Sequence, residues 1–392
     1  MSFNFDPRSP EFRRDPYPYY DLLLAQAPIF YWEPWGMTFL SRHEDCSELL
    51  RDNRLGRGAT GEPPPTQVDL AAMMNRWMLL MNPPDHTRLR GLVYKAFTPR
   101  MVEQLRGTIQ AITDRLLDRV AAQGEMELVA DFAYPLPVTV IAEMLGIPEA
   151  DRDVFHHWSD ALARSLDLTD DPAIYDRASV AAAEFTGYLR TLAARRRAEP
   201  ANDLLSALVR VEEAGEQLTE DELYATCALL LVAGHETTIN LIGNGTLALL
   251  RNLDQLRLLQ EKPELARTAV EELLRYDSPV QLTARTVLED ITYKDVTFHR
   301  GQEVAFLLSA ANHDPAVFAE PHRLDITRQK NPHLSFGSGI HYCLGAPLAR
   351  LEGQIAFATL LRRLPNLRLA TATPVYRDNL VLRGLESLPV TF

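Results

Sequence analysis

The sequence predicts a mainly α-helical protein with small β-sheets, and three observations support this fold class. Hydrophobic residues recur with a helical period through the middle of the chain. Strand-like pieces are few and lie towards the two ends. Strands and helices do not alternate regularly, which argues against a doubly wound parallel sheet.

Local patterns predict the individual elements in order. Residues rich in aromatic and β-branched side chains indicate short strands, and apolar residues at helical spacing indicate helices. The expected strands are 29–32 and 37–40, followed by pieces near 282–287, 291–298 and 303–307 and more near the C-terminus. The expected helices are 102–120, 137–145, 173–197, 219–250 and 348–364.

Length and composition limit the class of protein. The 392 residues allow two or three domains, and 46% hydrophobic residues can form a large core. Acidic residues outnumber basic ones, 53 to 40, so we expect no role in binding nucleic acid or an anionic membrane. Three widely spaced cysteines without a CxxC pair argue against a disulfide framework and suit a reducing cytoplasm.

The N-terminal segment has no apolar stretch that would make it a signal sequence. The longest strictly apolar run, 227–233, is far shorter than the about 20 residues that a membrane span needs. We therefore expect a cytoplasmic location and no membrane partner.

The segment 219–250 is the most unusual predicted helix. Thr219 and Glu222 form a capping box that can start it, and its apolar centre suits a path through the interior. A polar turn, Gly234-His235-Glu236-Thr237-Thr238, then interrupts this centre. Ala233 and Gly234 leave space for something flat beside the backbone. Two interpretations stay open: a core helix with a satisfied polar turn, or a wall that supplies a proton path through Glu236 and Thr237.

Three familiar motifs are only partly matched. His235-Glu236 lacks the second histidine of HExxH, because Ile239 stands at that position. The glycines of 243–248 lie inside a predicted helix, not after a strand as a dinucleotide site requires. The loop Gly337-Ser338-Gly339 lacks the outer glycines of a nucleophile elbow.

A single cysteine, Cys343, follows a glycine-rich loop and precedes a long amphipathic stretch, 348–364. A thiol near a helix N-terminus is biased towards the thiolate, and loop glycines let the backbone approach a planar ligand. A thiolate held in this way can be an axial ligand of haem iron. A buried structural cysteine and a nucleophile with His341 as its base remain alternatives.

The chain resembles the cytochrome P450 haem-thiolate monooxygenases in their soluble bacterial form. The loop FGSGIHYCLG matches the family's cysteine-ligand pattern, and AGHETT matches its oxygen-activation motif. Glu272 and Arg275 look like the family's ExxR, which selects Glu272 over Glu271. The segments 83–90 and 312–321 also resemble family motifs, so the correspondence covers nearly the whole chain in order.

The resemblance implies one domain, 1–392, with a haem between a long central helix and the cysteine loop. Its parts would be a β-rich region at about 1–60, a helical body at about 85–280 and a mixed region at about 281–392. The cofactor would be haem b, iron protoporphyrin IX, with Cys343 as the metal ligand. The remaining implied cofactor contacts are His86, Arg90, Arg285, His341, Phe336, Gly345, Ala233 and Gly234.

By the same resemblance, Glu236 and Thr237 are the catalytic pair: Thr237 holds an ordered water and Glu236 relays protons. His235 stands at the variable position of the motif and is expected to be structural. Glu272 and Arg275 are expected to lock their helix to the cysteine-loop side. The apolar pocket would include Trp77, Met78, Leu79 and Met81, although an apolar stripe is as often core as pocket wall.

The implied activity is insertion of one atom of O₂ into a small or medium apolar organic substrate. Electrons would come from a separate ferredoxin or flavodoxin with its NAD(P)H-dependent reductase, because no flavin or nicotinamide domain fits in the chain. Arg350, Arg362 and Arg363 are candidate docking contacts. Two alternatives are a haem-thiolate peroxygenase that uses hydrogen peroxide and a non-catalytic haem or ligand-binding module.

Overall fold

The computed structural model describes residues 6–58, 63–167, 171–211 and 218–392. The chain forms two compact units: the first contains residues 1–58, 113–134 and 237–392, and the second contains 59–112 and 135–236. Helices predominate and the sheets are small, which confirms the predicted fold class. The expected single domain remains a prediction.

The first unit holds most of the strands. Its main sheet has the order β1-β2-β8-β5-β3, with β2 and β8 parallel and the other neighbours antiparallel. Successive side chains of a strand point to opposite faces, and both faces of this sheet are covered: Leu40, Val304 and Phe306 belong to one hydrophobic cluster, and Met37, Phe39 and Ala305 belong to another. The bounds are β1 Ile29–Trp32, β2 Met37–Leu40, β3 Leu55–Gly56, β5 Thr283–Val287 and β8 Glu303–Phe306.

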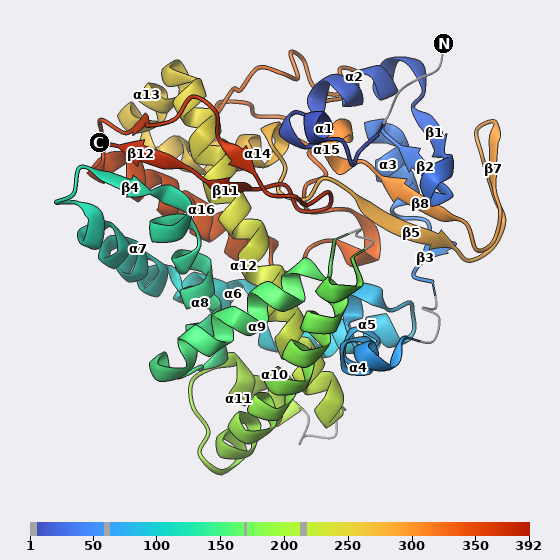
Figure 1. Cartoon of the computed structure of the whole chain (residues 1–392), viewed down its shortest axis with the longest axis horizontal. Helices are drawn as coiled ribbons and strands as arrows, with labels where there is room; N and C mark the ends of the chain where they lie inside the picture. The colour runs from blue at the N-terminus through green and yellow to red at the C-terminus, as the bar shows by residue number, and fades with distance from the viewer. Residues whose placement is uncertain (1–5, 59–62, 168–170, 212–217) are drawn as a thin grey trace. The chain divides into compact units, whose positions relative to one another are not determined.

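Three smaller sheets complete the strands of the first unit. The hairpin of β6 (Ile291–Tyr293) and β7 (Val296–Phe298) projects from the rim of the main sheet (Figure 1). Its turn contains Lys294 with a positive φ of 53°. In the other two sheets, β12 pairs with both β4 and β9, and β10 pairs with β11. The bounds are β4 Glu125–Glu127, β9 Arg368–Leu369, β10 Val375–Tyr376, β11 Leu385–Ser387 and β12 Pro389–Thr391.

The helices of the first unit flank these sheets, and α14 packs against α16. Gly353 of α16 allows this close packing, because a Cβ atom there would lie 3.1 Å from Val270 of α14. The bounds are α1 Pro10–Arg14, α2 Tyr17–Gln26, α3 His43–Leu49, α13 Leu253–Glu261, α14 Ala266–Tyr276, α15 Leu308–Ala311 and α16 Ala346–Arg363.

The described part of the second unit is helical. Its long helix α10 contacts α9, α4 and α11. Aromatic rings join α9 to α10, with the ring centroids of Phe155 and Phe185 5.8 Å apart. The bounds are α4 Val68–Met74, α5 Asp85–Ala96, α6 Pro99–Gln104, α8 Pro135–Leu145, α9 Arg152–Arg164, α10 Pro172–Ala198 and α11 Leu204–Val211.

Two helices, α7 (Arg106–Val120) and α12 (Glu220–Arg251), contribute residues to both units. The predicted capping box at the start of α12 is confirmed: the Glu222 N–H donates to Thr219 Oγ1 at 3.2 Å, and the Thr219 N–H donates to Glu222 Oε2 at 2.9 Å. By length and composition α12 could cross a membrane. However, 83% of its apolar window is buried within the protein, as in the core helix of a globular protein.

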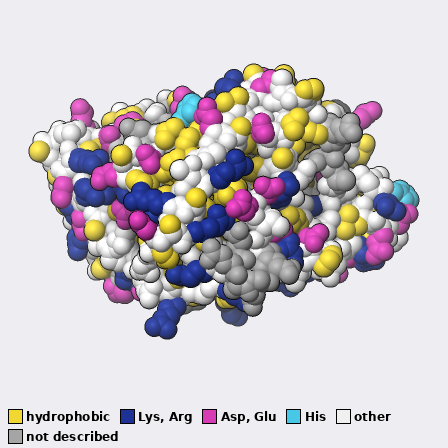
Figure 2. All heavy atoms as spheres, turned by 90° about the horizontal axis from the view of Figure 1, so that it is seen from below, with side chains coloured by type: hydrophobic (Ala, Val, Ile, Leu, Met, Phe, Trp, Pro, Cys, Tyr) yellow, Lys and Arg dark blue, Asp and Glu magenta, His cyan; other side chains and the backbone are white. Residues whose placement is uncertain are grey.

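The single helix expected at 102–120 is instead two helices, α6 and α7. The Leu105 N–H bonds to Val102 O, an i to i−3 bond that tightens the turn and ends α6. The surface is of mixed sign: on the face in Figure 2, basic and acidic side chains are interspersed, with hydrophobic side chains scattered among them.

Candidate active site

The cysteine loop belongs wholly to the first unit. The Cys343 N–H donates to Phe336 O at 2.9 Å, which closes the loop directly before α16. Gly337 and Gly339 both have a φ of +69°, a backbone conformation that glycine adopts without strain. A Cβ on Gly339 would lie 2.4 Å from Leu50 O, so this glycine also lets the loop pack on the end of α3. Cys343 itself is partly exposed, whereas Cys46 and Cys227 are buried.

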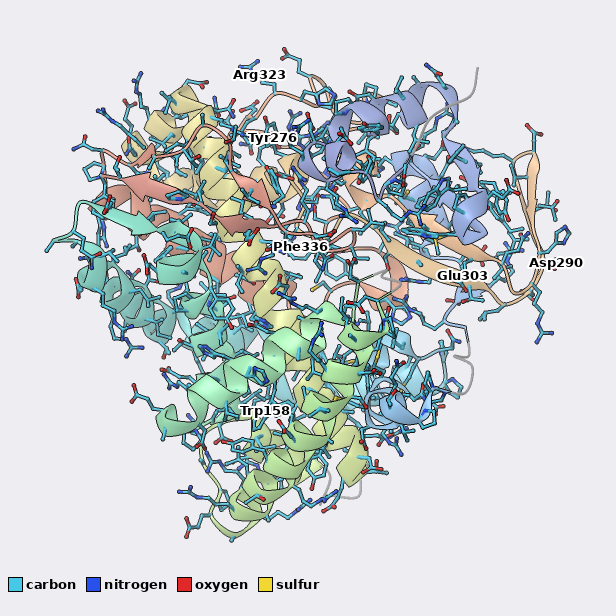
Figure 3. All side chains as sticks on the ribbon, viewed as in Figure 1. Trp158, Tyr276, Asp290, Glu303, Arg323 and Phe336 are labelled. Atoms are coloured by element: carbon cyan, nitrogen blue, oxygen red, sulfur yellow. The ribbon has the colours of Figure 1, made fainter. Side chains whose placement is uncertain are left out.

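Gly345 and Phe336 are the loop residues that neighbour Cys343. Gly345 is the N-cap residue of α16, and a Cβ there would make ordinary contact with Cys343 Sγ at 3.9 Å. The ring of Phe336, labelled in Figure 3, lies under the guanidinium of Arg350, 4.5 Å from it. Arg350 in turn donates to both oxygens of Glu271 at 2.7 and 2.9 Å. This chain of contacts ties the loop to α14.

The ExxR pair is completely buried, which explains why Glu272 and not Glu271 is its member. Arg275 donates to both Glu272 oxygens at 2.8 Å, and both side chains are 0% exposed. Arg275 also donates to three backbone carbonyls, of Asn312, Pro321 and Arg323. The pair therefore fixes α14 to the segment that leads into the cysteine loop.

The two predicted carboxylate-binding residues of the first unit lie on different elements. Arg285, on β5, is 4% exposed and donates to Thr283 Oγ1 at 3.0 Å and Ala284 O at 2.8 Å. Burial, with a smaller contribution from the positive charge of Arg57, lowers the pKa of Arg285 to about 9. His341 ends the short helical turn Gly339–His341 and is partly exposed.

The second unit holds His86, Arg90, Ala233, Gly234 and Glu236. His86 and Arg90 stand four residues apart on α5, so both lie on one face of the helix, with His86 only 2% exposed. Ala233 is exposed although the preceding residues of α12 are buried, which leaves room against that face. Gly234 differs from the expectation in part: a Cβ there would approach Ile141 of α8 at 3.2 Å, so packing also requires a small residue.

Glu236 and Thr237 are consecutive residues of α12; Glu236 is 7% exposed and Thr237 partly buried. The adjacent His235 is fully buried and held on two sides. Its Nδ1 lies 2.9 Å from Leu231 O, and since a carbonyl only accepts, Nδ1 carries the proton in the neutral ring. Ser159 Oγ of α9 lies 3.1 Å from both Nδ1 and Nε2, and Nε2 lies 3.9 Å from Glu236 Oε2. His235 thus has hydrogen-bond partners in the interior, beside the predicted acid.

The structure adds two residues that sequence reasoning missed. Arg57 donates to Ala284 O at 2.8 Å and lies beside Arg285. Glu352 of α16 is 1% exposed, with a bond to Thr238 and no hydrogen-bond partner for Oε2 among the described residues. Burial raises the pKa of Glu352 to about 8. Nothing in the sequence around Glu352, seven residues after Gly345, indicates a functional role, and Arg57 stands in an irregular segment.

The structure also places the predicted pocket residues and docking arginines, some of which are buried or form ion pairs. Trp77 and Met78 are buried at 0% and 5%, whereas Leu79 and Met81 are partly exposed. Of the candidate docking arginines, Arg350 pairs with Glu271 and Arg363 pairs with Asp114 and Asp118. Arg362 is exposed.

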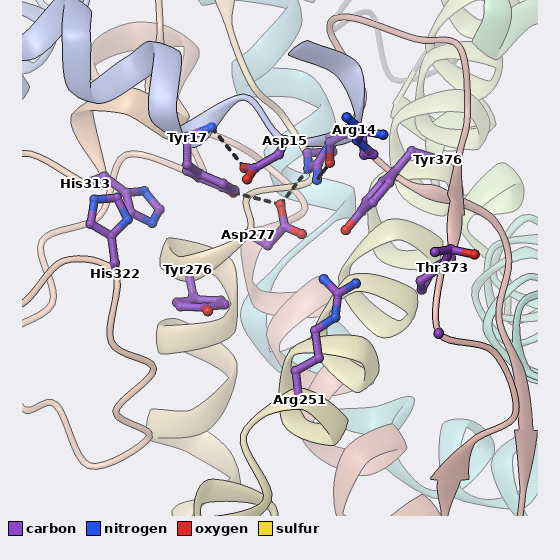
Figure 4. A pocket seen from close by; sticks show the side chains of 13 residues that line it. Arg14, Asp15, Tyr17, Arg251, Tyr276, Asp277, His313, His322, Thr373 and Tyr376 are labelled. Atoms are coloured by element: carbon purple, nitrogen blue, oxygen red, sulfur yellow. Dashed lines mark hydrogen bonds and ion pairs between the residues drawn. The ribbon is translucent and has the colours of Figure 1, made fainter. Parts of the chain in front are cut away.

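A separate pocket of about 470 Å³ lies in the first unit and includes none of the predicted site residues (Figure 4). Arg383 and Asp277 form an ion pair at its centre. Arg383 Nε and the Tyr17 hydroxyl donate to Asp277 Oδ1 at 2.9 and 2.7 Å. Arg383 also donates to the carbonyls of Arg13 and Arg14 and stacks on Tyr376 at 3.8 Å. These contacts anchor the N-terminal segment, which is a structural role.

Comparison with known proteins identifies the class. The cytochrome P450 family model matches residues 26–369. The chain is 43% identical over 387 residues to the biotin biosynthesis cytochrome P450 of Bacillus subtilis, covering 98% of each chain. The chain belongs to the cytochrome P450 family; it is an oxidoreductase, and its family cofactor is haem iron.

Solved structures give the same result for the fold. P450BioI in complex with acyl carrier protein ligated to hexadec-9Z-enoic acid has a TM-score of 0.94, 43% identity, and coverage of 98% of this chain and 100% of that one. Myxobacterial CYP267B1 with myristic acid has a TM-score of 0.91 and 44% identity, with 98% coverage of both chains. The predicted cytochrome P450 fold is therefore confirmed.

The residues present fit a haem on two observations. Among the described residues, no carboxylate forms an ion pair with the buried Arg285, which suits a residue that holds the carboxylate of a cofactor. Ala233 presents open surface in an otherwise buried stretch of helix, which suits the approach of a flat ring.

Proposed function

We propose that the protein is a haem b-dependent monooxygenase that inserts one atom of O₂ into a C–H or C=C bond of an apolar organic substrate. The observation that carries this proposal is the partly exposed Cys343 thiol, held on a glycine-shaped loop directly before α16. When bound, the haem supplies reductive activation of O₂, and thiolate ligation favours O–O cleavage.

The side chains of this protein would divide the remaining work. Cys343 would ligate the iron, with Phe336 and Gly345 beside it. Arg285, His341, His86 and Arg90 would bind the two carboxylates of the haem, as cationic and N–H donors do. Ala233 and Gly234 would allow the ring to approach α12.

Proton delivery would depend on Glu236 and Thr237. Thr237 would hold a water molecule through its hydroxyl, and Glu236 would pass protons to it. Thr237→Ala is expected to divert electrons to hydrogen peroxide, measured as peroxide formed per NAD(P)H consumed. Unchanged coupling would remove Thr237 from this role.

We propose a ferredoxin or flavodoxin with an NAD(P)H-dependent reductase as the electron donor, and a cytoplasmic location. Arg362 is the strongest of the three docking candidates, because Arg350 and Arg363 already form ion pairs within the protein. Arg362→Glu should raise the KM for the donor, whereas substrate affinity should not change.

The substrate is proposed to be small or medium in size and apolar, and fatty acyl chains are candidates. Two solved relatives contain such chains, one free and one attached to a carrier protein. A titration series of free acids, alcohols and carrier-bound acyl groups, followed by the spin state of the ferric haem, would distinguish these forms.

The decisive test is spectroscopic. The reduced protein with CO should show the red-shifted Soret band of thiolate ligation, and Cys343→Ser should abolish it. Cys46→Ser and Cys227→Ser are matched controls that should leave the band intact, because both thiols are buried elsewhere. A Soret band typical of histidine ligation contradicts the proposal, and turnover with peroxide alone would favour a peroxygenase.

A further inference from the structure

Glu271 of α14 accepts three hydrogen bonds, although the ExxR motif selects its neighbour Glu272. Arg350 of α16 donates to it twice, from Nε to Oε1 at 2.7 Å and from Nη2 to Oε2 at 2.9 Å. His333 donates from Nε2 to Oε2 at 3.1 Å. The His333 side chain is 3% exposed, and those of Glu271 and Arg350 are 24% and 31% exposed. Three directed bonds to one partly buried carboxylate distinguish this network from an isolated surface ion pair, which contributes little.

The position of the proton on His333 follows from its two partners. The Ser335 N–H can only donate, and it lies 3.3 Å from His333 Nδ1, so Nδ1 carries no proton. The ring proton is therefore on Nε2, which donates it to Glu271. The ring is neutral, so the charges of Glu271 and Arg350 balance one to one. The centroid of the same ring lies 5.8 Å from that of Phe336 in the cysteine loop.

Arg350 contacts the cysteine loop on both sides of the bond that closes it. Its guanidinium lies 4.5 Å from the centroid of the Phe336 ring, and Phe336 O accepts the Cys343 N–H at 2.9 Å. Its Nη1 donates to the hydroxyl of Tyr342, the residue directly before Cys343, at 3.2 Å. The positive charge that Glu271 holds is thus placed against the loop that carries the proposed iron ligand.

A charge at this place affects how readily a bound iron is reduced. The ferrous state carries one negative charge more than the ferric state, so a nearby cation favours reduction and a nearby anion opposes it. Burial raises the pKa of Glu271, but the hydrogen bonds from His333 and Arg350 outweigh this effect and lower the pKa to about 2. The carboxylate is therefore ionised at neutral pH and offsets the charge of Arg350.

We propose that Glu271 is a positioning residue of the haem site: it holds Arg350 against Phe336, neutralises the charge of Arg350 and thereby keeps the reduction potential of the iron low. The effect is exerted through Arg350 and His333, the side chains that donate to Glu271. The inference rests on the proposed function, because it requires Cys343 to ligate haem iron. It gives a role to the acidic residue that the ExxR motif leaves aside.

Redox potentiometry of the holoenzyme tests this role by removing one charge at a time. Glu271→Gln keeps an oxygen that can accept from Arg350 but removes the negative charge. The ferrous state should then be favoured on the order of tenfold, or about 59 mV for one electron, the size expected for one unit charge about 10 Å away at an effective dielectric constant of about 20. Arg350→Gln should shift the equilibrium by a similar factor in the opposite direction. The double variant keeps the net charge and should stay within about threefold of the wild type.

Asp118→Asn is the matched control for loss of an acid that pairs with α16. Asp118 forms an ion pair with Arg363 at 2.6 Å, about 20 Å further along that helix than Arg350. The potential of this variant should equal that of the wild type. Small-molecule mediators carry the electrons in all measurements, so the docking of a donor protein does not affect the result.

Opposite shifts in the two single variants, with recovery in the double variant, support the proposal. A purely structural role would loosen the loop in both single variants, so shifts in the same direction overturn it. An unchanged potential in Glu271→Gln, or a double variant that retains the shift of either single variant, also overturns it. If Arg350→Gln does not retain haem, Glu271→Asp decides: this variant keeps the charge and should stay within about threefold of the wild type. A shift in Glu271→Asp as large as that in Glu271→Gln overturns the proposal.

The CO spectrum separates this inference from the proposed function. A wild-type protein without the Soret band of thiolate ligation contradicts the proposed function, and the inference fails with it. A wild-type protein with that band but without the opposite shifts contradicts the inference alone. The same spectrum of each variant confirms that thiolate ligation is retained before its potential is compared.

Discussion

Arg275 and Arg285 are both buried arginines of the first unit, yet their surroundings are opposite. Arg275 meets both oxygens of Glu272 and three backbone carbonyls. Arg285 meets one hydroxyl and one carbonyl, with the positive charge of Arg57 beside it. Burial of an arginine is therefore no indication of its role; the presence or absence of an internal counter-charge separates a structural arginine from one suited to a ligand.

The largest expected effect comes from breaking the buried ion pair between Glu272 and Arg275. Arg275→Gln leaves Glu272 as a buried carboxylate without its main partner, which should lower the free energy of unfolding by about 3–5 kcal/mol. Chemical denaturation of the holoprotein measures this loss, with haem content as a second readout. A loss below about 1 kcal/mol would mean that the counter-charge of Glu272 does not give Arg275 the structural role that distinguishes it from Arg285.

A smaller effect is expected at Asp277, the carboxylate that pairs with Arg383 in the pocket of Figure 4. Asp277→Asn removes the counter-charge of the buried Arg383 but leaves its two carbonyl acceptors, so the expected loss is about 2–3 kcal/mol. The CO spectrum should not change, because this pocket includes none of the proposed site residues. A changed spectrum would connect the pocket to the haem site.

Glu352 allows the effect of burial to be tested on an acidic side chain. Its pKa is raised to about 8 in the folded protein, so between the usual value of 4.5 and about 8 the folded state holds a proton that the unfolded state has lost. The free energy of unfolding from this group therefore falls as pH rises through that range. Glu352→Gln should remove this dependence, so that between pH 5 and pH 8 the variant gains stability relative to the wild type by at most about 3–4 kcal/mol. Parallel pH profiles for both proteins would contradict the assignment.

The smallest effect is expected at a neutral contact. Ser159→Ala removes the hydroxyl that lies 3.1 Å from both ring nitrogens of His235 and should cost about 1 kcal/mol of stability. Ser165→Ala is a control on the same segment, because the Ser165 hydroxyl donates to the nearby Leu162 O, within its own helix end. If the His235 ring also positions Glu236, the variant at 159 alone should form more peroxide per electron pair. Equal coupling in both variants would restrict His235 to a structural role.

Much of the fold and part of the site follow from local sequence patterns. The capping box at Thr219 and the bounds of α10, α12 and β5 depend on neighbours a few residues away, and the structure agrees with those predictions. The selection of Glu272 over Glu271 came from the family motif. The break at Leu105 was missed because the apolar period continues across it while the backbone tightens.

The features that escaped prediction depend on distant segments. Arg57 and Ala284 are 227 positions apart, and Ser159 and His235 are 76 apart. No periodicity encodes which side chains such segments bring together. Glu352 was missed for a related reason, since its pKa results from the packing around it and not from its own helix.

Glu222 has a consequence for engineering the helix that carries His86 and Arg90. One carboxylate both caps α12 and forms an ion pair with Arg88 of α5. The orientation of α5 is therefore coupled to the integrity of a different helix end within the second unit. Replacement by Gln would separate the two tasks, since an amide oxygen can still accept the Thr219 N–H while the ionic tether to Arg88 is lost. This position offers a single-residue means of loosening α5 without unwinding α12.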